Sequence, residues 1–152
     1  MKTLHFTVEI DAPAAHVWRS MLDEDTYREW TTAFGGESSY EGGWATGDAI
    51  RFVGADEDGN SMGMIGFIDV SRPEEFVSIE YTGMVIDGVD DFSSDAAKRV
   101  VGTHENYTFA ENGGVTTLTI DIDVDDEWEA SFSQMWPVAL DSLKTIAERP
   151  AR

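Results

Sequence analysis

Residues 126–149 carry apolar side chains at helical spacing, and this run limits what the rest of the chain can form. The spacing predicts an amphipathic helix whose apolar face must lie on a large apolar surface. Pro137 falls inside this helix and removes one backbone donor, so we expect a kink or a break there. The apolar face consists of Trp128, Phe132, Met135, Trp136, Ala139, Leu140, Leu143, Ile146 and Ala147.

The upstream sequence has the patterns of a sheet that would supply this surface. Residues 4–10 alternate between apolar and polar side chains, which predicts a strand with one buried face. Asp11 and Pro13 then suit the start of a helix, and two short helices are predicted to follow the first strand. Strand patterns return in six runs, at residues 38–42, 49–54, 61–70, 76–84, 102–110 and 115–124.

Two connections in this pattern are informative. The connection at residues 85–100 is long for a hairpin, so we expect a functional or mobile loop, in which residues 96–99 could form a helical turn. The last two strands are joined by residues 111–114, with Asn112-Gly113 at the centre, a pair typical of hairpin turns.

The predicted fold class is therefore α+β. We expect a curved antiparallel sheet of about seven strands, wrapped around a long C-terminal helix, with two short helices after the first strand. The sequence shows no internal repeat and no linker, and its length is that of one domain. Residues 1–152 are expected to form a single domain.

The chain is strongly acidic, with 10 Lys and Arg against 30 Asp and Glu and a net charge of −20. A field of this sign repels phosphates, so we expect neither nucleic acid nor an anionic membrane as a partner. The preferred interpretation is a solvated surface that keeps the protein in solution, and adaptation to high salt is a second. Attraction of a cationic ligand or a basic partner is a third, for which the sequence offers no local signal.

Several kinds of site are excluded or unsupported. The chain has no cysteine, which excludes disulfides, thiolate chemistry and zinc–thiolate sites. Residues 1–6 lack a long apolar run, so we expect no signal peptide, no membrane span and a cytoplasmic location. The three histidines lie on separate predicted elements and no phosphate-binding loop is present, so the sequence predicts neither a metal site nor a cofactor.

A set of short motifs occurs in a fixed order along almost the whole chain. They are Ile10-Asp11-Ala12-Pro13 with Val17-Trp18 and Trp30, Gly66-Phe67-Ile68 with Pro73, Tyr107-Thr108-Phe109 with residues 113–119, and Trp136 with Leu140, Leu143-Lys144 and Ile146. Each motif is degenerate alone, but their order resembles the helix-grip fold of the SRPBCC superfamily, which includes START domains, birch-pollen-type allergens and polyketide cyclases. Within it, the chain is most similar to bacterial proteins related to the C-terminal domain of the heat-shock-protein-90 ATPase activator.

This resemblance implies a deep pocket between the sheet and the terminal helix, which many members use for apolar or amphipathic small molecules. It does not imply one activity, because the superfamily includes carriers, sensors, cyclases and co-chaperones. Large side chains in mid-strand, on a short helix or on the aromatic half of the long helix are the best candidates for the pocket wall, although each could instead be core. They are Trp30, Phe52, Met64, Tyr81, Tyr107, Phe132 and Trp136.

Two polar residues are weak candidates for catalysis in such a pocket. Glu105 shares strand parity with Tyr107, so it would face inward, where burial would raise its pKa, but the preferred interpretation is that strand twist leaves it solvated. Arg51 could point inward to Glu105 or a ligand carboxylate, or outward to the surface acids. His104 and its strand neighbours point to opposite faces, so no nucleophile–base arrangement is predicted.

Three functions remain open. The favoured one is non-catalytic binding of a small apolar or amphipathic molecule, as a carrier or sensor, by a monomer or a homodimer. The second is a cyclase-like or hydrolase-like enzyme that uses the polar groups of the pocket. The third is a chaperone-interacting module like the heat-shock-protein-90 activator, which is weakened because the rest of a eukaryotic-type activator is missing from this sequence.

Overall fold

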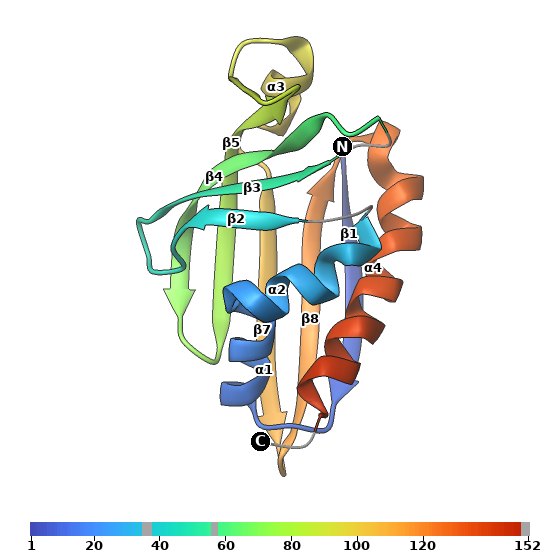
Figure 1. Ribbon diagram of the computed structural model, residues 1–152. Coiled ribbons are helices and arrows are strands. Elements are labelled where there is room, and N and C mark those ends of the chain that lie inside the picture. Colours follow the sequence, from blue (N-terminus) through green and yellow to red (C-terminus); the bar gives the residue numbers. More distant parts are fainter. Residues whose placement is uncertain (35–37, 56–57, 150–152) are drawn as a thin grey trace.

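The computed structural model describes residues 1–34, 38–55 and 58–149. Seven strands form an antiparallel sheet in the order β1-β8-β7-β5-β4-β3-β2, and an eighth strand, β6, pairs with β5 (Figure 1). The strands are β1 (Lys2–Ile10), β2 (Ser39–Gly42), β3 (Ala49–Ala55), β4 (Ser61–Arg72), β5 (Phe76–Ile86), β6 (Val89–Asp91), β7 (His104–Asn112) and β8 (Val115–Val124).

The two short helices after β1 and the long C-terminal helix lie on one face of this sheet, whereas a further short helix lies near the end of β5. Figure 1 shows α4 running beside β1, while the two short helices after β1 cross in front of β7 and β8. The helices are α1 (Ala14–Leu22), α2 (Glu24–Trp30), the 3-10 helix η1 (Thr31–Phe34), α3 (Asp95–Val100) and α4 (Asp126–Ala147). This arrangement confirms the predicted α+β class and the helix-grip-like order of elements. None of the described helices has the length and apolarity that a bilayer crossing requires.

The core forms where the alternating strands meet the apolar face of α4. Phe6 lies opposite Ile120 in the β1–β8 ladder, and Leu4 lies opposite Ile122. Leu143, in the second half of α4, has no exposed surface. The apolar periodicities of the first strand and the last helix therefore describe the two sides of one interface.

Glycines in β4 allow the sheet to curve. A Cβ atom on Gly63 would lie 1.8 Å from the carbonyl oxygen of Phe52, and one on Gly66 would lie 2.3 Å from that of Glu80. The β4–β5 register also shifts between Ile65 and Gly66. Strands that approach so closely admit no side chain, and glycine at such positions permits a bend. Figure 1 shows β2 and β3 running across the direction of β7 and β8.

The long helix is continuous, so the expected break at Pro137 is wrong. Helix α4 runs unbroken from Asp126 to Ala147. The proline leaves the carbonyl of Ser133 without its helical donor, but both residues are exposed, so water can satisfy that group. The bend at Pro137 stays a prediction.

The hairpin turn differs by one residue from the expected one. Asn112 pairs with Val115 in the β7–β8 ladder, so the turn consists of Gly113 and Gly114. Their φ angles are +61° and +84°, and a two-residue turn of type I′ needs positive values at both positions. Asn112-Gly113 is therefore not the centre of the turn.

The connection at residues 85–100 is more ordered than a plain loop. It contains β6, which pairs with β5, and the expected helical turn is present as α3. The side chain of Ser94 caps α3 by accepting a hydrogen bond of 3.2 Å from the backbone N–H of Ala97.

Candidate functional site

A cavity of about 440 Å³ lies between the sheet and the first half of α4. This volume lies in the range of sites that hold small organic molecules. The residues expected in the pocket wall come together here, although their role in binding a ligand stays a prediction. All seven line the cavity: Trp30, Phe52, Met64, Tyr81, Tyr107, Phe132 and Trp136.

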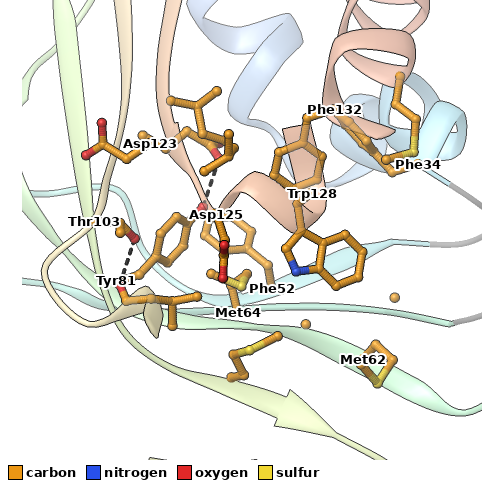
Figure 2. Close-up of a pocket in the computed structure, with 18 of the residues that line it drawn as sticks. Phe34, Phe52, Met62, Met64, Tyr81, Thr103, Asp123, Asp125, Trp128 and Phe132 are labelled. Atoms are coloured by element: carbon orange, nitrogen blue, oxygen red, sulfur yellow. Dashed lines mark hydrogen bonds between the residues drawn. The ribbon is translucent and has the colours of Figure 1, made fainter. Parts of the chain in front are cut away.

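The outer part of the wall is aromatic and thioether in character. Figure 2 shows Trp128 and Phe132 projecting from the start of α4, with Met62, Met64 and Phe52 on the strands opposite. Trp128 is 43% exposed and marks the entrance. Methionine side chains re-pack easily, so this part of the wall can adapt to the shape of an occupant.

The inner end of the cavity is closed by Trp136. Its ring centroid lies 5.1 Å from that of Phe34, 6.0 Å from that of Trp30 and 6.3 Å from that of Tyr107. Only 3% of Trp136 is exposed. This residue therefore belongs to the core and to the cavity wall at once.

One wall of the cavity carries four polar side chains, which we call the polar cluster: Tyr27, Tyr81, Glu105 and Tyr107. The Tyr81 hydroxyl donates a hydrogen bond of 3.0 Å to Oε1 of Glu105, and the Tyr107 hydroxyl donates to Oε2. Glu105 is only 8% exposed, so the expectation that it is solvated is wrong. Strand β7 lies between β5 and β8, which leaves no edge where twist could turn the side chain outward.

Burial controls the protonation of the polar cluster. Loss of solvent raises the pKa of Glu105, although its hydrogen bonds from Tyr107 and Tyr81 act in the opposite direction. Burial and the neighbouring carboxylate raise the pKa of both tyrosines, so they remain hydrogen-bond donors. Among the described residues, no Lys, Arg or His forms an ion pair with Glu105.

Replacing Glu105 by glutamine tests this account of its burial. Because the folded-state pKa is raised, ionisation of Glu105 destabilises the wild type as pH rises through that value. We expect Glu105→Gln to be more stable than the wild type at about pH 8, by on the order of 1 kcal/mol. The difference should vanish near pH 4.5, the ordinary value for glutamate. Urea denaturation at both pH values measures it, and an equal difference at both would contradict the account.

Arg51 takes the outward of its two expected orientations. Its Nε donates a hydrogen bond of 3.0 Å to Asp90, and a terminal nitrogen lies 2.9 Å from the same carboxylate. Glu41 lies 3.6 Å away on the neighbouring strand. Arg51 therefore does not neutralise Glu105, and it takes no part in the cavity wall.

Charged residues surround the entrance to the cavity. Arg99 of α3 lies 2.7 Å from the carboxylate of Asp125 and 3.5 Å from that of Glu127. Asp123 also lines this part of the cavity, but its carboxylate accepts hydrogen bonds from the Thr3 hydroxyl and the backbone N–H of His104 on the outer face of the sheet. The entrance thus carries two carboxylates, those of Asp125 and Glu127, and an arginine that pairs with both.

Three possible metal ligands meet on the outer face of the sheet. Nε2 of His104 lies 3.2 Å from Glu80 and 3.7 Å from Asp69, and the three ligand atoms lie within 4.8 Å of one another. These residues could hold a divalent cation. The same distances suit ion pairs of a protonated imidazole. The sequence does not indicate this group, because only one of its three members is a histidine and the other two are common surface carboxylates.

Tyr27 and Arg99 were also missed as site residues. Tyr27 falls at helical spacing with Trp30 and Phe34, so the sequence contained the signal for an inward position. Arg99 and Asp125 lie 26 positions apart in the sequence, and no local pattern predicts that they form an ion pair. It follows from the placement of α3 beside the start of α4.

A family model described as "Activator of Hsp90 ATPase homolog 1-like protein" matches residues 11–148. The match covers the polar cluster, the aromatic walls and the acidic entrance. A search of curated proteins finds no match to this chain.

Solved structures share the fold at low sequence identity. A crystal structure of a protein from Nitrosomonas europaea has a TM-score of 0.75 and 13% identity, over 95% of this chain and 92% of its own. A protein from Mycobacterium smegmatis has a TM-score of 0.70 and 16% identity, over 99% and 93%. The solution structure of the Aha1 dimer from Colwellia psychrerythraea has a TM-score of 0.68 and 15% identity, over 97% of each chain. At such identities the likeness concerns the fold alone.

Proposed function

Because the chain belongs to the Activator of Hsp90 ATPase homolog 1-like family, within the SRPBCC superfamily, we propose that it binds a small apolar or amphipathic molecule in the cavity under α4. The single observation that carries the proposal is the cavity itself, about 440 Å³ in volume and lined mainly by apolar side chains, many of them aromatic or methionine. A site of this kind buries most of a small organic ligand, while a few polar groups orient it.

The position of the cavity supports a binding role. Large exposed apolar side chains gather at its open end, where Met1 and Trp128 line the entrance. Val89 of β6 is 65% exposed and pairs with Ile86, another lining residue. An apolar rim of this kind favours the entry of an apolar molecule from water.

The two alternative functions have less support. A hydrolytic enzyme would need a nucleophile beside a base, whereas the side chains that contact Glu105 are tyrosines whose pKa is raised by burial. A chaperone-binding role has the support of the family description only. A homodimer is supported by the Aha1 dimer from Colwellia psychrerythraea, and for this chain it remains one of two expected states.

Titration with N-phenyl-1-naphthylamine, a neutral fluorescent apolar probe, tests the binding function. We expect saturable binding at one site and an affinity about tenfold lower in Phe132→Ala, a change of about 1.4 kcal/mol. Phe132 projects into the cavity, so its removal takes away contact surface. Val138→Ala on the same helix is the control, because Val138 is 60% exposed and does not line the cavity. Equal affinities in the two variants, or no saturable binding, would contradict the proposal.

A further inference from the structure

Glu105 is a buried carboxylate in a largely apolar cavity, and no cation of the described residues pairs with it. We propose that the cavity selects ligands with a protonated amine at one end of an apolar body, and that the ammonium group binds the Glu105 carboxylate. This inference rests on the proposed binding function and adds the chemical class of the ligand.

The hydrogen bonds around Glu105 leave room for such a group. A carboxylate offers about four lone-pair positions, and the hydroxyls of Tyr81 and Tyr107 occupy one on each oxygen. Both tyrosines are donors, which favours the ionised carboxylate as their acceptor. Tyr27 also lines the cavity, and its hydroxyl makes no hydrogen bond within residues 1–34, 38–55 and 58–149. An ammonium group could thus donate to Glu105 and to Tyr27 at once.

The surrounding rings also favour a cation. Phe52 lies 6.4 Å from Tyr81 and 6.1 Å from Tyr27, measured between ring centroids, so aromatic faces stand beside the polar cluster. The negative face of an aromatic ring attracts an ammonium group, and this attraction is larger where water is excluded. An apolar body would lie along Met64 and Phe132 towards the entrance.

The charge at the entrance also favours a cationic ligand over an anionic one. Asp125 and Glu127 line it, and Arg99 already pairs with both of them. The net charge of the chain is −20. An anionic amphiphile would meet this field at the entrance and the Glu105 charge inside, whereas a cationic one is attracted by both. The unpaired Glu105 carboxylate is thus a local feature that favours a cationic ligand, and the sequence alone did not indicate one.

Displacement of bound N-phenyl-1-naphthylamine by three ligands of equal chain length tests the proposal. Octylamine, octan-1-ol and octanoate differ only in the head group, and at about pH 8 the first is a cation and the last an anion. We expect octylamine to displace the probe at a concentration about tenfold lower than octan-1-ol, because a charge-assisted hydrogen bond is stronger than a neutral one. Octanoate should be the weakest of the three.

Two variants locate the origin of the preference. Glu105→Gln should bring octylamine to within about twofold of octan-1-ol, because it removes the charge while the shape of the side chain is nearly unchanged. Asp141→Asn removes the same charge from the exposed side of α4 and should keep the full preference. Preference retained in Glu105→Gln would overturn the proposal.

The possible outcomes test the proposed ligand class and the proposed binding function separately. Equal displacement by octylamine and octan-1-ol from the wild type, or stronger displacement by octanoate, overturns the amine proposal and leaves the binding function intact. Failure of the probe and of all three ligands to bind overturns both. The ligand series on the wild type decides the matter even if Glu105→Gln does not fold.

Discussion

Leu143→Ala is expected to lower the free energy of unfolding by about 2–5 kcal/mol. Leu143 has no exposed surface and lies in the half of α4 that packs on the core, away from the cavity. Truncation removes buried apolar contacts and leaves a void that the surrounding side chains fill only in part. Urea denaturation followed by circular dichroism measures the loss.

The matched control for this change lies on the same helix. Val138 is 60% exposed, and Val138→Ala should change the free energy of unfolding by less than about 0.5 kcal/mol. A loss below about 1 kcal/mol for Leu143→Ala would contradict the packing of α4 described above. It would mean that the second half of the helix is not anchored on the sheet.

Gly63→Ala is the second substitution with a large expected effect, a loss of about 2–3 kcal/mol or more. The added Cβ would lie 1.8 Å from the carbonyl oxygen of Phe52, so β3 and β4 must separate. The φ angle of Gly63 is not in the left-handed region, so contact with the neighbouring strand is the cause of the loss. Thermal and urea denaturation measure it.

Gly59→Ala distinguishes the stability lost through steric contact from the stability lost through backbone conformation. Gly59 has a φ angle of +82°, but nothing lies within 4 Å of an added Cβ. Only the conformational cost remains there, about 1 kcal/mol. If the two alanine variants lost equal stability, close strand contact at Gly63 would not be the reason for the glycine.

The sequence predicted the parts of the fold that depend on periodicity. The alternation of residues 4–10 and 115–124 and the helical spacing of residues 126–149 identified three elements and the faces that they bury. Each pattern reflects burial on one side of an element, and this property is visible in the sequence alone. The order of these elements was enough to indicate the helix-grip arrangement, which the structure confirms.

Features that depend on contacts between distant segments were harder to predict. Strand parity placed Glu105 beside Tyr107 on one face, but its burial depends on the two strands that flank β7. The outward position of Arg51 depends on Asp90, which β6 brings close. Pro137 suggested a break because the sequence does not show that this turn of α4 faces water.

The site was predicted in part for the same reasons. Parity and position on the helix face identified all seven wall candidates as residues that line one cavity. The polar cluster was missed as a unit because its members come from α2, β5 and β7, which meet only in the folded sheet. The role proposed for Glu105 depends on its having no Lys, Arg or His partner in the described part of the chain. A sequence does not show which charges remain unpaired after folding.

The strand order has a consequence for folding kinetics. Strand β1 is synthesised before the other strands of the sheet, yet it pairs with β8 at one edge of the sheet, and α4 lies beside it. Its partners therefore leave the ribosome only after β2 to β7 have been made, at a synthesis rate of roughly 5–20 residues per second. Until then β1 presents an unpaired apolar edge, and the strongly non-local pairing favours slow folding. The nascent chain thus stays prone to aggregation until β8 and α4 have been made.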